Sequence, residues 1–300
     1  MPVDVNRPGP WNHRNLTARG TRFHVALAGP EAPSGSGVLT LLIHGFPECW
    51  WTWRHVIPAL AQAGHRVAAL DLRGFGGSDR PPSGYDLVTL AQDIAAVVRS
   101  LGHERAMVIG AGLGGQVAWA LPHVAPDLTR AIVPVGAPHP LALRSLRSRA
   151  LSGPALQYAS LQIPGLAERR LRSRSALEGL LRSWAGPHTR EAVAEEAPYY
   201  AELLSRPGAA RSALEPLRNL MLSRAETAAL EQPVTVPVLS VQGQLDPVQP
   251  AQAYARDTHH VTGNLHQATI RRSGHFPQEE APAELVRALI PFLADVAPAV

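Results

Sequence analysis

The distribution of apolar and polar residues along the chain predicts alternating strands and helices. Short apolar runs bounded by Gly, Pro and polar residues predict strands at residues 21–28, 38–43, 65–70, 106–109, 131–135, 236–241 and 268–271. Apolar residues at helical spacing predict helices at residues 53–63, 89–101, 113–124 and 280–293, and Gly102 ends the second of these. Strands that alternate with helices form a mainly parallel central sheet flanked by helices, the α/β fold class.

One long stretch departs from this alternation. Residues 139–233 contain helical stretches rich in Leu, Ala and Arg, broken by Pro and Gly, and no convincing strand. A helical block inserted between the strands of such a sheet is typical of a lid over a ligand site. We therefore expect a core domain made of residues 1–138 and 234–300, with residues 139–233 as a helical lid, or cap, subdomain.

Length and composition narrow the class of protein. A chain of 300 residues with 45% hydrophobic residues suits one soluble α/β domain with an insertion. The net charge is only +4, and all 28 basic residues are Arg. Because no basic stripe is interleaved with aromatic residues, we expect no nucleic-acid partner. The first residues form no apolar signal core and no apolar run approaches about 18 residues, so we expect a cytoplasmic protein without a membrane partner.

The sequence carries no signature of a bound cofactor. The single cysteine, Cys49, excludes an internal disulfide and a zinc site built from cysteines. The histidines show no metal-ligand spacing, and the glycine-rich residues 110–115 lack the Lys and the Ser or Thr of a phosphate-binding loop. We therefore expect neither a metal nor an organic cofactor.

The most informative pattern is the stretch MVIGAGLGG at residues 107–115. It reads as a buried strand that enters a tight turn of small residues and continues as a helix. This is the layout of a nucleophile elbow, Gly-x-nucleophile-x-Gly, in which small residues let the strand and helix backbones approach closely. The central residue of an elbow is Ser, Cys or Asp, but here it is Gly112, which has no side chain that could attack a substrate.

Other motifs surround the elbow in a characteristic order. They are HGFPE at residues 44–48, DLRGFGGSDRP at residues 71–81, GQLDP at residues 243–247 and SGHF at residues 273–276. Together with the elbow they resemble the α/β-hydrolase fold superfamily, in particular its branch of epoxide hydrolases and haloalkane dehalogenases. The resemblance covers nearly the whole chain and implies an α/β-hydrolase fold with an inserted helical lid.

The resemblance implies a role for each motif. His275 is the base of such a site, and Asp246 orients and electrostatically supports it. The backbone N–H groups of Phe46 and Leu113 form the oxyanion hole, which needs no particular side chain. Asp246 could instead cap the following helix, and His275 could be a surface histidine, but their order after the elbow favours the catalytic interpretation.

Further residues are candidates for the substrate pocket. We expect His44, Trp50, Trp51 and Tyr158 to line it, with an apolar small molecule as substrate or ligand, although the tryptophans could equally pack beneath the lid. Cys49 is the only thiol in the chain. An unpaired cysteine without a neighbouring base is more often a small buried apolar residue than a nucleophile.

Two lid positions differ from the epoxide hydrolase pattern. In that family the elbow Asp attacks the epoxide, and two lid tyrosines donate hydrogen bonds to its oxygen. The corresponding lid positions here are Ser160 and Leu217, and only a shifted alignment would recruit Tyr158 for the first of them. The resemblance therefore does not extend to the two-step epoxide hydrolysis of the family.

Two functions fit these observations. The first is a hydrolase of low or altered activity, in which the Asp246–His275 dyad activates water or removes a substrate proton, without a covalent intermediate at Gly112. Its substrates would be reactive esters, lactones or epoxides. The alternative is a pseudo-hydrolase that keeps the pocket and the lid but binds or senses an apolar small molecule without catalysis. The recognisable acid, base and oxyanion motifs favour the first function.

Overall fold

The computed structural model describes residues 4–31, 37–143, 159–218 and 222–297, and in this part of the chain eight strands form one sheet. The strands are β1 (Asn12–Ala18), β2 (Thr21–Ala28), β3 (Leu39–Ile43), β4 (Arg66–Leu70), β5 (Ala106–Ala111), β6 (Thr129–Val135), β7 (Val238–Gly243) and β8 (Leu265–Ile270). Their order across the sheet is β1-β2-β4-β3-β5-β6-β7-β8. Strand β2 is antiparallel to both neighbours, and every other neighbouring pair is parallel. The predicted mainly parallel sheet is confirmed.

Burial explains which strands the sequence pattern revealed. All residues of β3 and β5 are buried, because helices cover both faces of the sheet there, and such strands are continuous apolar runs. Strand β1 lies at the sheet edge and is largely exposed, with the sequence NHRNLTA. Since this run is mostly polar, the hydrophobic pattern does not predict it, although it pairs with β2 along its whole length.

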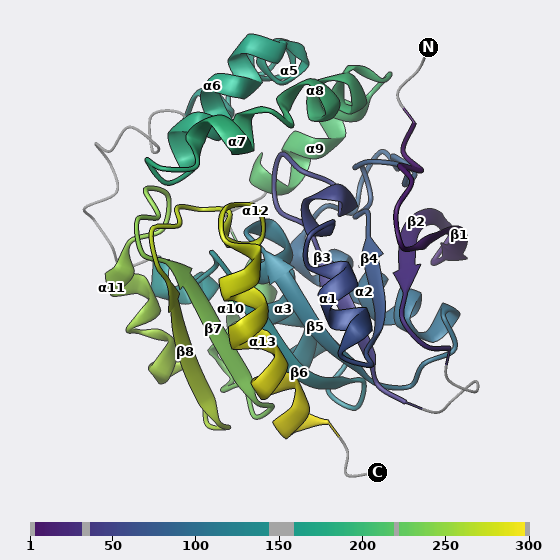
Figure 1. Cartoon of the computed structure of the whole chain (residues 1–300), viewed down its shortest axis with the longest axis vertical. Helices are drawn as coiled ribbons and strands as arrows, with labels where there is room; N and C mark the ends of the chain where they lie inside the picture. The colour runs from purple at the N-terminus through teal and green to yellow at the C-terminus, as the bar shows by residue number, and fades with distance from the viewer. Residues whose placement is uncertain (1–3, 32–36, 144–158, 219–221, 298–300) are drawn as a thin grey trace.

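Helices cover both faces of the sheet (Figure 1). Helices α1 (Ile57–Gln62) and α13 (Pro282–Val296) lie on the face toward the viewer, and α2 (Leu87–Ser100) and α3 (Leu113–Val124) lie on the other face. Shorter helices are η1 (Trp50–Trp53), η2 (Pro140–Leu143), α11 (Ala251–Tyr254), η4 (Asp257–His259) and α12 (Pro277–Glu280). Apolar side chains from the sheet and from these helices form one continuous core.

Among the described residues, five helices stand above the carboxyl ends of the parallel strands in Figure 1, and we refer to them as the lid. They are α5 (Leu166–Arg172), α6 (Arg174–Trp184), α7 (Arg190–Ala194), α8 (Ala197–Ser205) and α9 (Ala209–Arg218). This segment is helical, as the sequence pattern predicts, and it lies at the edge of the sheet at which ligands bind in open α/β folds.

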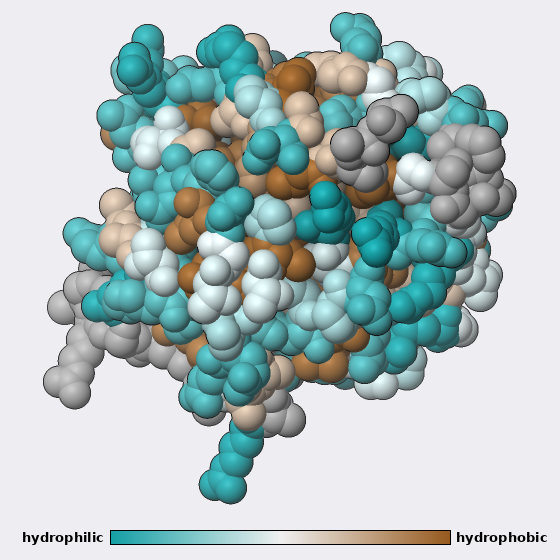
Figure 2. All heavy atoms as spheres, turned by 90° about the horizontal axis from the view of Figure 1, so that it is seen from below, coloured by the Kyte–Doolittle hydropathy of each residue, from teal (hydrophilic) through white to brown (hydrophobic). Residues whose placement is uncertain are grey.

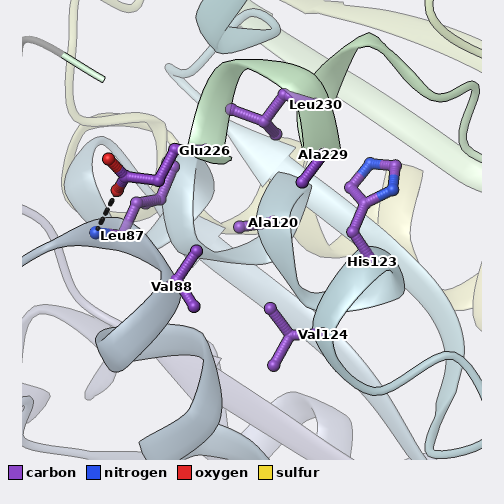
Figure 3. Close-up of a pocket in the computed structure, with 8 residues that line it drawn as sticks. All are labelled: Leu87, Val88, Ala120, His123, Val124, Glu226, Ala229 and Leu230. Carbon is purple, nitrogen blue, oxygen red and sulfur yellow. Dashed lines mark hydrogen bonds between the residues drawn. The ribbon is translucent and has the colours of Figure 1, made fainter. Parts of the chain in front are cut away.

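Helix α10 (Arg224–Glu231) has a different position from the other helices of the insertion. It packs against α2 and α3, and its Glu226 carboxylate accepts a hydrogen bond from the N–H of Leu87 at 3.1 Å. A small, mostly apolar pocket lies between these three helices (Figure 3). Residues 139–233 were expected to form the lid. Their last helix, α10, instead belongs to the helical layer that covers the sheet.

The corner between β5 and α3 is crowded by backbone atoms. A Cβ on Gly110 would lie 2.2 Å from the carbonyl oxygen of Gly114, and a Cβ on Gly114 would lie 2.4 Å from the carbonyl oxygen of Ile43. Only glycine fits at both positions, because these backbone atoms cannot move aside. The predicted close approach of strand and helix is therefore present, and it places Gly112 at the carboxyl edge of the sheet, beneath the lid.

The surface opposite the lid has no single apolar face. Figure 2 views this end of the molecule and shows apolar residues in several patches separated by polar ones. The large apolar side chains that are exposed in the described residues are Ile163, Leu166 and Leu245. None of the described helices combines the length and the apolar character that crossing a membrane requires.

Replacing Gly110 by alanine tests the crowded corner. The added methyl group would meet the Gly114 carbonyl oxygen, so we expect the variant to lose about 1–3 kcal/mol of unfolding free energy, measured by chemical denaturation. Gly179 in α6 is the matched control, because outside its own helix backbone and chain neighbours no described atom lies within 4 Å of its Cβ position. Gly179→Ala should be neutral or stabilise the helix by up to about 1 kcal/mol. Equal losses in both variants would contradict this expectation.

Candidate active site

Asp246 and His275 are hydrogen-bonded at the carboxyl edge of the sheet. Asp246 follows β7 and His275 follows β8, and because these strands are parallel neighbours, both loops leave the sheet at the same edge. The Nδ1 atom of His275 lies 3.0 Å from Oδ2 of Asp246. Since a carboxylate only accepts hydrogen bonds, Nδ1 carries a proton, and Nε2 holds the lone pair when the ring is neutral. This is the arrangement of a general base with its orienting acid.

The surroundings of the pair stabilise both partners. The Oδ1 atom of Asp246 accepts hydrogen bonds from the N–H groups of Val248 at 2.8 Å and Gln249 at 3.1 Å, so Asp246 also caps the turn that follows it. Burial lowers the pKa of His275, but the charge of Asp246 and its hydrogen bond outweigh burial and hold this pKa above the ordinary value of 6.5. The indole of Trp184 from the lid lies edge-on against the imidazole, with 5.5 Å between ring centroids.

Gly112 lies opposite the free ring nitrogen of His275. A Cβ on Gly112 would be 3.5 Å from Nε2 of His275 and 3.6 Å from Cα of Gly45, and apart from its chain neighbours it would meet no other described atom within 4 Å. The backbone of Gly112 has a φ of 47°, in the region where side chains are strained. A side chain here would point at the base, as the nucleophile of an elbow does.

Two backbone N–H groups flank this place. Phe46 follows Gly45 in the loop after β3, and Leu113 is the first residue of α3. Neither N–H donates a hydrogen bond within the described part of the chain, and the first N–H groups of a helix have no partner inside the helix. The N-terminus of α3 adds partial positive charge. Both N–H groups that the sequence analysis expects in an oxyanion hole are thus without a hydrogen-bond partner among the described residues.

A buried carboxyl group that the sequence interpretation did not assign lies beside the same place. The Oε2 atom of Glu48 lies 3.1 Å from the Cβ position of Gly45. Its Oε1 atom accepts hydrogen bonds from the hydroxyl of Thr52 at 2.6 Å and from the amide of Gln278 at 3.2 Å. Burial, and next the negative charge of Glu279, raises the pKa of Glu48 to about 8. Glu48 is therefore protonated at neutral pH. An acidic residue in an otherwise apolar loop was the available sequence signal.

His44, which we expected to line the substrate pocket, is surrounded by backbone groups of the core. Its ring is completely buried, and Nδ1 donates to the carbonyl oxygen of Gly45 at 2.7 Å while Nε2 accepts from the N–H of Leu72 at 3.1 Å. Burial lowers the pKa of His44, which keeps the ring neutral. Both ring nitrogens join backbone segments, so His44 holds the oxyanion loop to the loop after β4 instead of facing a substrate.

The two tryptophans of the expected pocket also have structural partners. Trp50 is completely buried, and its indole N–H donates to the carbonyl oxygen of Val5 at 3.0 Å. The indole N–H of Trp51 donates to the carboxylate of Glu196, beside α8, at 2.9 Å. These side chains join the core to the N-terminal segment and to the lid, so packing beneath the lid, the other interpretation from the sequence, describes their contacts better.

The other residues considered in the sequence analysis contribute little to the site. Tyr158, expected in the substrate pocket, lies outside the described residues. Burial, and next the charge of Asp71, raises the pKa of the Cys49 thiol well above its ordinary value, so this thiol stays protonated and is a poor nucleophile. Leu217 is buried in α9 and brings no hydroxyl group to the site. Ser160 lies directly before the described lid helices.

A small cavity lies between the lid and the core loops. It is lined by Glu48 and Cys49 from the core and by Tyr200, Leu203 and Leu204 from α8, together with further apolar residues. The part of the chain that the structure describes holds no group of three or more His, Cys, Asp and Glu residues that could bind a metal ion.

The raised pKa of Glu48 predicts a pH-dependent stability. Between pH 4.5 and about 8 the unfolded chain loses the Glu48 proton while the folded chain keeps it. The contribution of Glu48 to stability is therefore complete below pH 4.5 and is lost as the pH rises through about 8, at up to about 1.4 kcal/mol per pH unit.

Glu48→Gln should remove this dependence, because glutamine is neutral in both states. We measure the unfolding free energies of this variant and of the native chain by denaturation at several pH values. The value for the variant minus the value for the native chain should increase as the pH rises from 5 to 8. Glu284→Gln, at a half-buried carboxylate of α13, is the control and should follow the native chain. If the difference in unfolding free energy between the native chain and Glu48→Gln stayed constant from pH 5 to 8, the raised pKa of Glu48 would be contradicted.

Comparisons with known proteins identify the family of this fold. Residues 41–282 match the family described as alpha/beta hydrolase fold. The chain is 44% identical to Epoxide hydrolase B of Mycobacterium tuberculosis over 128 residues, which cover 42% of this chain and 35% of that protein. It is 30% identical to Epoxide hydrolase A of the same species over 323 aligned positions, covering 95% of this chain and 98% of that protein.

A solved structure shows the same likeness in three dimensions. Cfl2 from Burkholderia cenocepacia has a TM-score of 0.81 and 29% sequence identity to this chain, covering 94% of this chain and 96% of Cfl2. The family match extends over most of the sequence, and the likeness to Epoxide hydrolase A extends over nearly all of it. The chain therefore belongs to the α/β-hydrolase fold family, in its epoxide hydrolase-like branch.

Proposed function

We propose that this chain is a hydrolase that uses water directly, without a covalent enzyme intermediate. The observation that carries the proposal is the geometry at Gly112, where the Cβ position of a nucleophile would lie 3.5 Å from Nε2 of His275 and no side chain is present. In this proposal a water molecule approaches Nε2 on the side where the nucleophile of an elbow would stand, and donates a hydrogen bond to the base. The base faces this place through Nε2, Asp246 holds the opposite ring nitrogen, and the attacking side chain is the part that Gly112 lacks.

The reaction follows from the groups around Gly112. Neutral His275 takes a proton from the water at Nε2, and the water oxygen forms a bond to the carbonyl carbon of the substrate. The electrons of the carbonyl double bond move to its oxygen, where the N–H groups of Phe46 and Leu113 stabilise the charge. When this intermediate collapses, the bond to the leaving alcohol breaks and protonated His275 returns the proton to the alcohol oxygen. Asp246 stabilises the imidazolium between these steps.

Esters and lactones suit this site better than epoxides. The oxygen of an opening epoxide needs hydrogen-bond donors from the lid, and one of the two tyrosine positions holds Leu217, which has no hydroxyl group. A carbonyl oxygen instead finds backbone donors. General-base catalysis contributes about 10²- to 10⁴-fold, which favours substrates that are already reactive. The mostly apolar cavity beside Glu48 favours apolar, uncharged ones.

Loss of the nucleophile also supports a second candidate function. A pseudo-hydrolase would keep the lid and the cavity but bind or sense an apolar small molecule without turnover. Compared with the epoxide hydrolase pattern, Gly112 lacks the attacking group and Leu217 lacks a proton donor. The sheet and the lid are formed with these two residues in place. Turnover that depends on His275 distinguishes the two functions.

Hydrolysis of a panel of short esters, lactones and epoxides tests the proposal. We expect the native chain to hydrolyse activated esters or lactones, and His275→Ala to lower the rate by about 10²- to 10⁴-fold, because the general base is lost. His259→Ala, at an exposed histidine of η4, is the matched control and should keep the native rate.

The elbow itself provides the opposite test. Gly112→Ser places a hydroxyl on a Cβ that is 3.5 Å from Nε2 of His275, so this variant should form an acyl-enzyme with burst kinetics. It should also lose about 1–3 kcal/mol of stability, because a side chain is strained at this φ. A native chain that is inert beside an active Gly112→Ser variant would overturn the proposal and support the pseudo-hydrolase.

The pKa of His275 predicts the pH profile of hydrolysis. The base must be neutral, so kcat/KM should rise with pH, with a midpoint above 6.5, because Asp246 holds the pKa of His275 above that value. Asp246→Asn removes the charge, and the midpoint of the His275 ring, followed by NMR titration, should fall. If His275 titrated with the same midpoint in the native chain and in Asp246→Asn, Asp246 would not be the cause of the raised pKa of His275.

A further inference from the structure

One carboxylate holds the backbone on both sides of His275. Glu280, at the end of α12, accepts hydrogen bonds from the N–H of Gly274 at 2.8 Å and from the N–H of Phe276 at 2.9 Å. The N–H of Glu280 donates in turn to the carbonyl oxygen of Phe276 at 2.9 Å, which closes α12 onto the residue before it. Glu280 therefore fixes the two peptide units that flank the base.

The same carboxylate reaches the lid. Its Oε2 atom accepts hydrogen bonds from the N–H of Gly186 at 2.7 Å and from the hydroxyl of Thr189 at 2.5 Å, both in the connection between α6 and α7. The N–H of Gly274 donates to this same oxygen. Donors from the lid and from the loop of the base thus converge on one atom of Glu280, and an ionised carboxylate is the side-chain group that accepts from all of them.

The lid and the loop of the base are also in direct backbone contact. The N–H of His275 donates to the carbonyl oxygen of Trp184 at 2.9 Å. A Cβ on Gly274 would lie 2.3 Å from the backbone nitrogen of Gly186, and a Cβ on Gly186 would lie 2.9 Å from the backbone nitrogen of Gly274. Backbones packed this closely move together, because any independent shift opens a gap or creates an overlap.

We propose that Glu280 is a positioning residue for His275, and that it makes the alignment of the imidazole depend on the seating of lid residues 184–189. The inference rests on the proposed function, in which His275 is the base. With the lid seated, Glu280 is held by donors on both sides and directs the ring toward Gly112. With the lid lifted, Gly186 and Thr189 no longer hold the carboxylate, and the loop of the base loosens. The base is then aligned only where the lid excludes bulk water from it.

Two substitutions of Glu280 separate positioning from bulk stability. Glu280→Ala removes all four accepted hydrogen bonds. Glu280→Gln can keep the oxygen on which three donors converge and loses the charge and the bond from Phe276. We expect kcat to fall by about 10- to 100-fold in Glu280→Ala, with KM little changed because Glu280 does not meet the substrate, and Glu280→Gln to restore part of kcat.

Two measurements follow the alignment itself without turnover. Hydrogen exchange of the N–H groups of Gly186, Gly274 and Phe276 should become at least about 10-fold faster in Glu280→Ala. The NMR midpoint of the His275 ring should fall in both Glu280 variants, since the charge of Glu280 helps to hold the pKa of His275 up. Glu284→Gln is the control, because this carboxylate accepts one N–H, from Arg271, and should leave exchange and midpoint unchanged.

Thr189→Val keeps the inference testable where Glu280→Ala fails to fold. This variant removes only the lid hydroxyl, and faster exchange at Gly274 on the other side of the carboxylate would support the link between lid and base. Native exchange and a native His275 midpoint in the Glu280 variants or in Thr189→Val would overturn the inference. The inference would also be overturned if kcat fell only in proportion to the unfolded fraction of each variant and Glu280→Gln were no more active than Glu280→Ala.

The two proposals fail separately. The substrate panel alone decides whether the chain hydrolyses anything. Amide exchange and the titration of His275 report on Glu280 whether or not turnover occurs.

Discussion

Strand β5 and helix α3 meet at a corner that has no room for side chains at Gly110 or Gly114, where a Cβ would lie 2.2 Å and 2.4 Å from carbonyl oxygens. This contact sets the direction of the residue between them, so position 112 points at Nε2 of His275 whatever residue stands there. Within the described residues the N–H of Leu113 has no hydrogen-bond partner at the start of α3. The direction of position 112 toward His275 is therefore a property of the backbone.

A site of this kind loses one chemical step and keeps its electrostatics. Donors for a developing oxyanion and a base with an orienting acid stabilise charge that forms during attack, whichever oxygen attacks. An attacking side chain adds a covalent intermediate, and a water molecule does not. Gly112 also relieves the strain that a side chain has at a φ of 47°. Glycine at this position therefore favours the stability of the fold.

The carboxyl groups near His275 differ because their surroundings differ. Glu48 is buried beside Glu279 and is neutral at pH 7, since its pKa is raised to about 8. Asp246 pairs with His275 and accepts hydrogen bonds from two backbone N–H groups. Glu280 accepts only from backbone and hydroxyl donors and joins the lid to the loop of the base. Negative charge is thereby kept beside the base and away from the oxyanion donors.

Local patterns in the sequence determined the parallel strands, the flanking helices, the elbow and the order of the acid and base motifs, because periodicity and turn chemistry act over a few residues. Strand β1 escaped prediction because its exposed edge carries polar residues. The roles of His44 and Trp50 were decided by tertiary burial, and the contacts of Glu48 with Gln278, 230 positions away, by the meeting of distant loops. The same holds for Glu280 and the lid: pairings between remote segments depend on how the whole chain packs, and a single sequence records them in no local pattern.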